Sequence, residues 1–162
     1  MEIERKWLFD MSKVPICLAT RTVEYTQAYI SIEPEVRIRS KKIVGGKENT
    51  TYMLCIKGNG TVSRIEVQKH LTKEEYDELM QVGNINPNDV IKKYYYVIDV
   101  DGYELTVGTV DVGTKDSFSY GEIEFNSEEE ANVFVAPYWF GEDVTNKPEY
   151  KMKNYWKRTR LE

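Results

Sequence analysis

Histidine and cysteine are scarce in this sequence, which limits the metal chemistry that it can carry. The 162 residues include one histidine, His70, and two cysteines, Cys17 and Cys55, which are far apart and not in a CxxC spacing. These three residues cannot form a zinc site of the usual kind. We therefore expect both cysteines to be ordinary buried thiols.

Long hydrophobic runs are also absent. No apolar stretch approaches the roughly 18 residues that a membrane span needs, and the first residues are charged, unlike the apolar core of a signal peptide. We therefore expect a soluble cytoplasmic protein without a membrane partner. The net charge of −5 argues against a nucleic-acid partner bound through bulk positive charge, although it allows a local basic pocket. The sequence carries no signal for the oligomeric state.

Strand patterns dominate the chain. Apolar residues make up 41% of it, which suits one globular domain over residues 1–162. Alternating or β-branched segments predict about eight strands, at Ile3–Phe9, Glu24–Ile32, Glu35–Ser40, Thr50–Lys57, Val62–Lys69, Val90–Val100, Tyr103–Val112 and Phe118–Phe125. Most connections are short, with turn signals at Gly45-Gly46, Gly58-Asn59-Gly60 and Asp101-Gly102, so the sheet should be antiparallel.

Three short segments have helical patterns instead. Capping boxes at Thr72–Glu75 and Ser127–Glu130 each precede apolar residues at helical spacing, including Phe134 and Val135 in the second segment. A third apolar stripe follows Pro148. Each helix has one apolar face and needs a surface to cover. The predicted class is therefore α+β, mainly β.

Charged residues alternate along several of the predicted strands. Side chains two residues apart share one face of a strand. The first and last strands place paired acids on such a face, at Glu2 and Glu4 and at Glu122 and Glu124. The first strand also places Lys6 on this face. Other strands contribute mainly bases to one face, at Arg37, Arg39, Lys57, Arg64 and Lys93, with Glu66 and Gln68 beside Arg64.

These charges have two interpretations. They are either the solvated face of a half-buried sheet or the lining of a wet cavity inside a closed barrel, with the helices on its outer face. The grouping of signs by strand favours the cavity, since a solubility surface tends to intersperse both signs. A closed barrel of about eight strands has room for one small ligand. Carboxylates bind Mg²⁺ or Mn²⁺, while arginine and lysine bind phosphate, so this lining is typical of a polyphosphate site.

The same residues resemble a known family. Glu2-Ile3-Glu4-Arg5-Lys6 is similar to the ExExK signature of the CYTH, or triphosphate tunnel metalloenzyme, superfamily, which includes inorganic and thiamine triphosphatases, class IV adenylate cyclases and fungal RNA triphosphatases. Further similar segments follow in order along nearly the whole chain, at Thr26–Ile30, Val36–Arg39, Leu54–Gly58, Arg64–Glu66, Gly121–Phe125 and Pro148–Tyr150. The resemblance implies an eight-stranded antiparallel closed barrel with charges inside and helices packed outside.

The resemblance also implies residue roles. The metal ligands for Mg²⁺ or Mn²⁺ would be Glu2, Glu4, Glu122 and Glu124. The phosphate path would be lined by Lys6, Arg37, Arg39, Lys57, Arg64 and Lys93. Glu66 would be a second metal ligand or would organise the basic side chains. The residues implied in catalysis are Glu4, Lys6, Glu66 and Lys93.

The sequence departs from the family pattern at four positions. Tyr95 stands where an arginine is expected, Gln68 replaces an acid, and Thr106 and Gly108 fall near positions that often hold acids. Asp111 or Glu104 could substitute for those acids in part. Tyrosine can donate one hydrogen bond but carries no charge near neutral pH, so the grip on one phosphate should be weaker.

Three functions are consistent with these residues. The complete set of acids and bases favours metal-dependent hydrolysis of a small-molecule triphosphate. A class IV adenylate cyclase would use the same acids, but nothing in the sequence marks an adenine pocket. The departures at Tyr95 and Gln68 motivate the third function, a polyphosphate- or nucleotide-binding module with little turnover.

Overall fold

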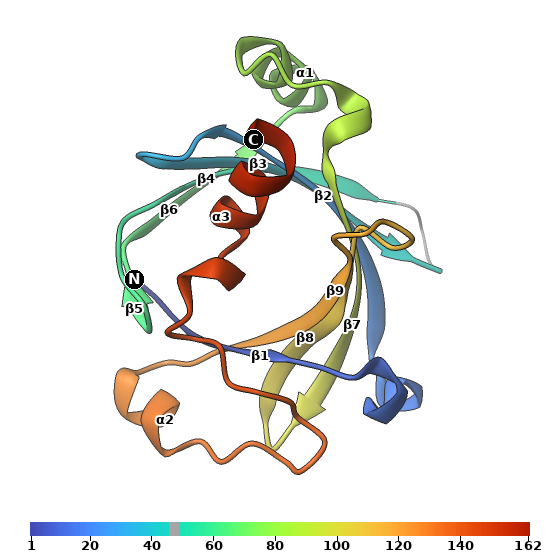
Figure 1. Cartoon of the computed structure of the whole chain (residues 1–162), viewed down its shortest axis with the longest axis vertical. Coiled ribbons are helices and arrows are strands. Elements are labelled where there is room, and N and C mark those ends of the chain that lie inside the picture. Colours follow the sequence, from blue (N-terminus) through green and yellow to red (C-terminus); the bar gives the residue numbers. More distant parts are fainter. Residues whose placement is uncertain (46–48) are drawn as a thin grey trace.

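Antiparallel strands account for most of this computed structural model, which describes residues 1–45 and 49–162 (Figure 1). Nine strands form one sheet in the order β5-β1-β9-β8-β7-β2-β3-β4-β6, and the pairings are antiparallel. Their bounds are Glu2–Leu8 (β1), Arg21–Ser31 (β2), Glu35–Val44 (β3), Thr50–Lys57 (β4), Ser63–Arg64 (β5), Glu66–Leu71 (β6), Ile91–Val100 (β7), Tyr103–Val110 (β8) and Phe118–Glu124 (β9).

The sheet curls into a nearly closed barrel because its two ends are joined through Ile65. β5 pairs with β1, whereas β6 pairs with β4, and only Ile65 separates β5 from β6 along the chain. The predicted antiparallel barrel is therefore confirmed, with one correction. The single strand predicted at Val62–Lys69 is two strands, since the chain changes partner at Ile65, whose carbonyl accepts a hydrogen bond from the Gly58 amide at 2.8 Å. Such irregularities are common at barrel corners.

The predicted hairpin turn at Asp101-Gly102 is present in the structure. Asp101 and Gly102 have φ angles of 52° and 86°, the left-handed pair that a tight hairpin between β7 and β8 requires. Gly46, in the predicted Gly45-Gly46 turn, lies outside the described residues. Cys55 is buried as expected, but the expectation for Cys17 was wrong, because it lies exposed in a short 3₁₀ turn, Ile16–Leu18.

Two helices pack on the outer surface of the barrel (Figure 1). α1, Lys73–Val82, begins with the predicted capping box and buries Tyr76 and Met80 against outward-facing residues such as Ala28 and Ile38. α2, Glu128–Val133, is shorter than predicted, and Phe134 lies in extended backbone after its end. The Phe134 ring still packs against Trp7, with ring centroids 5.6 Å apart.

The C-terminal segment crosses in front of the barrel in the view of Figure 1. It contains a 3₁₀ turn, Pro148–Tyr150, then α3, Met152–Trp156, and a final helical turn, Lys157–Leu161. Asp111, buried at the end of β8, anchors this segment: its carboxylate accepts a hydrogen bond from the Tyr155 hydroxyl at 2.6 Å and pairs with Arg160 at 2.8 Å. None of the described helices is long and apolar enough to cross a membrane.

The anchor at Asp111 gives a first prediction. Tyr155→Phe removes the hydroxyl but keeps the ring, so it should lower the free energy of unfolding by about 1.5–3 kcal/mol, the range for a hydrogen bond to a charged group. Denaturant unfolding measures the change. The matched control is Tyr138→Phe, because Tyr138 is 99% exposed. Equal stability of both variants would mean that Asp111 does not anchor α3.

Candidate functional site

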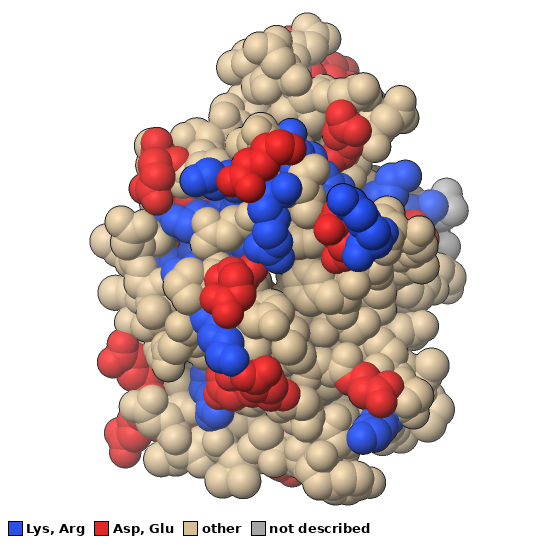
Figure 2. All heavy atoms as spheres, viewed as in Figure 1, with Lys and Arg blue, Asp and Glu red and all other residues tan. Residues whose placement is uncertain are grey.

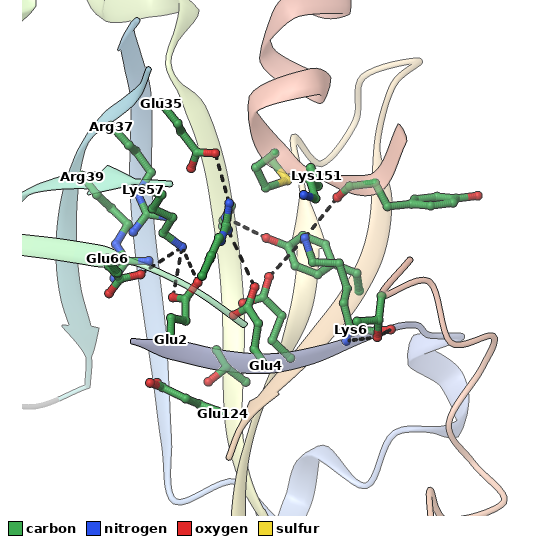
Figure 3. Close-up of a pocket in the computed structure, with 18 of the residues that line it drawn as sticks. Glu2, Glu4, Lys6, Glu35, Arg37, Arg39, Lys57, Glu66, Glu124 and Lys151 are labelled. Atoms are coloured by element: carbon green, nitrogen blue, oxygen red, sulfur yellow. Dashed lines mark hydrogen bonds and ion pairs between the residues drawn. The ribbon is translucent and has the colours of Figure 1, made fainter. Parts of the chain in front are cut away.

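Charged side chains from the strands line one cavity of about 490 Å³ inside the barrel (Figure 3). All the site residues predicted from the sequence contribute to its lining, namely Glu2, Glu4, Lys6, Arg37, Arg39, Lys57, Arg64, Glu66, Lys93, Glu122 and Glu124. Lys6, Arg37, Lys57 and Lys93 are each 9% exposed or less. A solvated sheet face would expose these long side chains, so the structure supports the interpretation as a cavity lining.

Acids and bases alternate at one side of the cavity, where they form a connected set of ion pairs. Lys57 Nζ lies 3.0 Å from Glu2 Oε1 and 3.2 Å from Glu66 Oε2. Arg64 lies 3.2 Å from Glu2, 3.2 Å from Glu35 and 3.9 Å from Glu4. Figure 3 shows Glu2 of β1 and Glu66 of β6 pointing toward Lys57. Buried charges require such partners, since an unpaired ion in the interior is very costly.

Two of these acids have strongly raised pKa values. Burial, with the neighbouring Glu122 and Glu2 carboxylates, raises the pKa of Glu4 to about 8. Burial, with a hydrogen bond to Glu66, raises the pKa of Glu2 to about 7. Glu122 shows the opposite behaviour: burial opposes its ionisation, but Lys6 and Lys93 outweigh burial and hold its pKa well below its usual range. At neutral pH Glu4 thus mostly retains its proton, whereas Glu2 is only partly protonated.

The acids fit a hard divalent cation by their donor chemistry. They offer carboxylate oxygens without histidine or cysteine, the set that Mg²⁺ and Mn²⁺ prefer, and the raised pKa of Glu4 reflects the crowding that a cation relieves. In the described part of the chain, however, no three acid, histidine or cysteine side chains are grouped closely enough to hold a metal ion as they stand. Glu2 already forms ion pairs with Lys57 and Arg64, so these pairs must open before Glu2 can bind a metal ion.

Three bases inside the barrel form no ion pair with a described carboxylate. Arg37 is 8% exposed, and its Nε has no hydrogen-bond acceptor. The Arg39 guanidinium lies over the Tyr25 ring, 4.5 Å from its centroid. Lys93 donates to the Tyr120 hydroxyl at 2.7 Å, and burial together with Arg37 and Arg39 lowers its pKa well below the usual value. Cations crowded in this way, with no described carboxylate within ion-pair distance, form a site for an anion.

Several cavity residues were not among the sequence predictions. Glu35, Tyr29 and Tyr120 line the cavity, and they face inward because they lie two residues from, or in register with, predicted site residues. Extending the alternation by one step along β2, β3 and β9 identifies them. Lys151 also lines the cavity and donates to the Gly60 carbonyl at 2.6 Å. It comes from the C-terminal segment, so no strand periodicity could reveal it.

The departures from the family pattern lie where the register predicts, with one correction. Gln68, Tyr95 and Thr106 line the cavity, and Gly108 is the register partner of Tyr95. Glu104 also reaches the cavity lining, where it pairs with Arg21 at 3.0 Å. The suggestion that Asp111 replaces an inward acid is wrong, because Asp111 lies beyond the end of β8 and anchors the C-terminal segment instead.

The raised pKa of Glu4 gives a second prediction, for protein in a metal chelator. Between pH 5 and 8 the folded state holds a proton on Glu4 that the unfolded state has released, so this residue's contribution to stability falls as pH rises. Glutamine needs no proton at this position, so Glu4→Gln removes the free-energy cost of keeping Glu4 protonated. The free energy of unfolding of the variant, relative to the unaltered protein, should therefore rise by roughly 1–3 kcal/mol between pH 5 and 8.

Denaturant unfolding at pH 5 and pH 8 measures this difference. The matched control is Glu24→Gln, since Glu24 is exposed on β2 and should show no pH-dependent difference. A Glu4→Gln difference that stays constant from pH 5 to 8 would contradict the buried, protonated state of Glu4.

Similarity to known proteins agrees with the sequence motifs and the fold. No family model matches the chain. The chain is 27% identical over 161 residues to an inorganic triphosphatase of Nitrosomonas europaea, covering 94% of each protein. It is 29% identical over 154 residues to an inorganic triphosphatase of Acetivibrio thermocellus, covering 94% of the chain and 91% of the relative.

A solved structure shows the same fold. The crystal structure of an inorganic triphosphatase superposes on 96% of this chain and 93% of its own, with a TM-score of 0.56 and 24% sequence identity. The two relatives are matched over almost their full lengths, and the solved structure has the same barrel fold. These similarities agree with the resemblance of the strand motifs to the CYTH superfamily.

Proposed function

We propose that this protein hydrolyses a triphosphate inside the barrel, with inorganic triphosphate as the substrate and Mg²⁺ or Mn²⁺ as the cofactor. The observation that carries the proposal is the division of the cavity into an acidic side and a side of unpaired cations, Arg37, Arg39 and Lys93. Two relatives matched over nearly their whole lengths are named inorganic triphosphatases, which supports the same activity.

The unpaired cations would bind the phosphate chain. Arg37 and Arg39 can each bind phosphate oxygens bidentately, and Lys93 adds a third donor. Lys6 adds a further cation, whose Nζ lies 3.3 Å from Glu122 and donates to the Tyr150 carbonyl of the C-terminal segment at 3.1 Å. These contacts hold a triphosphate across the barrel and neutralise the charge that develops as the phosphoanhydride bond breaks.

The glutamates would hold the metal ion. Glu2, Glu4, Glu122 and Glu124 supply oxygen ligands, with Glu66 beside Glu2. A bound divalent ion polarises phosphoryl oxygens and lowers the pKa of a water molecule for attack on the terminal phosphorus. Glu4 must release its proton to act as a ligand, so the same crowding that raises its pKa becomes favourable once positive charge is present.

Phosphate release tests this proposal. The unaltered protein should release phosphate from inorganic triphosphate with Mg²⁺ or Mn²⁺, and EDTA should abolish the release. Glu4→Gln should reduce kcat at least about 100-fold, because a ligand of the catalytic ion is lost. Glu24→Gln, on the outer face of β2, should keep normal activity. Parallel reactions with ATP and thiamine triphosphate rank the substrates.

The products separate the other functions that the sequence allows. Cyclic AMP and pyrophosphate formed from ATP would identify a class IV adenylate cyclase. Tight binding of triphosphate without release of phosphate, with either metal, would contradict hydrolysis and indicate a binding module.

A further inference from the structure

Tyr95 has a buried hydroxyl that no described residue meets with normal hydrogen-bond geometry, although the Tyr120 hydroxyl lies close enough to contribute to its raised pKa. Tyr95 is 4% exposed and lines the cavity, and its Oη is one of four buried side-chain atoms without a hydrogen-bond partner in the part of the chain that the structure describes. Buried hydroxyl groups normally find partners, because an unpaired one loses its hydration without compensation. A ligand in the cavity could supply the missing acceptor.

The Tyr95 ring is held in place by its neighbours, which fixes the position of the hydroxyl oxygen. Gly108 lies opposite Tyr95 in the sheet, and a Cβ atom at position 108 would lie only 2.6 Å from Tyr95 Cδ1. Glycine therefore creates the space in which the ring lies. Tyr25 and Tyr120 pack edge-to-face on Tyr95, with ring centroids 5.8 and 5.6 Å away. The hydroxyl oxygen is therefore in position before any ligand arrives.

The groups around Tyr95 favour an anionic acceptor. Lys93 Nζ lies 5.6 Å from the centroid of the Tyr95 ring, and Arg39 stacks on the neighbouring Tyr25. Neither base pairs with a carboxylate among the described residues, whereas Lys57 and Arg64 on the acidic side do. Burial, with Tyr120 and Glu122 nearby, raises the pKa of Tyr95 well above its usual value, so the hydroxyl remains a donor.

We propose that Tyr95 is a substrate-binding residue whose hydroxyl donates a hydrogen bond to a phosphoryl oxygen held between Arg39 and Lys93. The inference rests on the proposed function, since it assigns a further donor to the same bound triphosphate. An uncharged donor adds direction without adding positive charge to a place where Lys93 and Arg39 already repel each other. The Tyr95 hydroxyl would therefore orient one phosphoryl group, and Gly108 leaves the space that the Tyr95 ring needs.

Binding of inorganic triphosphate in EDTA tests the role of Tyr95 apart from catalysis. Isothermal titration calorimetry should give a Kd for Tyr95→Phe that is about tenfold higher than for the unaltered protein, the loss expected for one hydrogen bond to a charged oxygen. The melting temperature without ligand should stay the same or rise, because the variant removes only an unpaired polar group. The matched control is Tyr94→Phe, the adjacent outward-facing tyrosine, which should bind normally.

Each other outcome has a definite meaning. A Kd for Tyr95→Phe within twofold of the unaltered value would overturn the inference and leave the proposed function intact. A melting temperature several degrees lower would also overturn it, since the hydroxyl would then have a partner within the protein. If the unaltered protein neither binds nor hydrolyses triphosphate, the proposed function fails, and the role of Tyr95 fails with it.

Discussion

The pairing of charges inside a closed barrel is the constraint on which the rest of this structure depends. A closed antiparallel sheet directs every second side chain of each strand inward, and here many of those side chains are glutamate, lysine or arginine. Interior charges are tolerated only when they are compensated. Lys57 and Arg64 compensate Glu2, Glu35 and Glu66, and this cross-strand set replaces the apolar packing that most small barrels have.

Not every charged side chain in the cavity has a partner of opposite charge, and this leaves the cavity able to bind charged ligands. Burial, together with the nearby Glu122 and Glu2 carboxylates, raises the pKa of Glu4, while burial, together with Arg37 and Arg39, lowers the pKa of Lys93. A bound polyanion with a divalent cation would relieve both conditions at once, since it places negative charge near Lys93 and positive charge near Glu4. Much of the apolar material of the fold lies outside the barrel, where α1 and α2 cover the outward faces of strands. The C-terminal segment instead packs over the cavity, where Lys151 joins the lining and Trp156 packs on Tyr29.

Sequence periodicity was sufficient to predict most of the strands of the barrel and most of the residues that line its cavity. The two-residue period identifies the inward set, and the Asp101-Gly102 turn sets the register that brings Tyr95 opposite Gly108. Periodicity could not show the change of partner at Ile65, because this depends on how the sheet closes. It also could not place Lys151 or Asp111, whose positions follow from the path of the C-terminal segment over the barrel.

The position of β1 in the sheet has a consequence for folding. β1 lies between β5 and β9, and its pairing with β9 brings Glu4 opposite Glu124. The first strand therefore pairs with the last strand of the barrel. Contacts between residues so distant in sequence are slow to form, because the entropy of closing the loop is lost before the contact is gained. The glutamates of β1 and β9 therefore stay hydrated and far apart until a late step, when closure of the barrel and assembly of its acidic interior become one event.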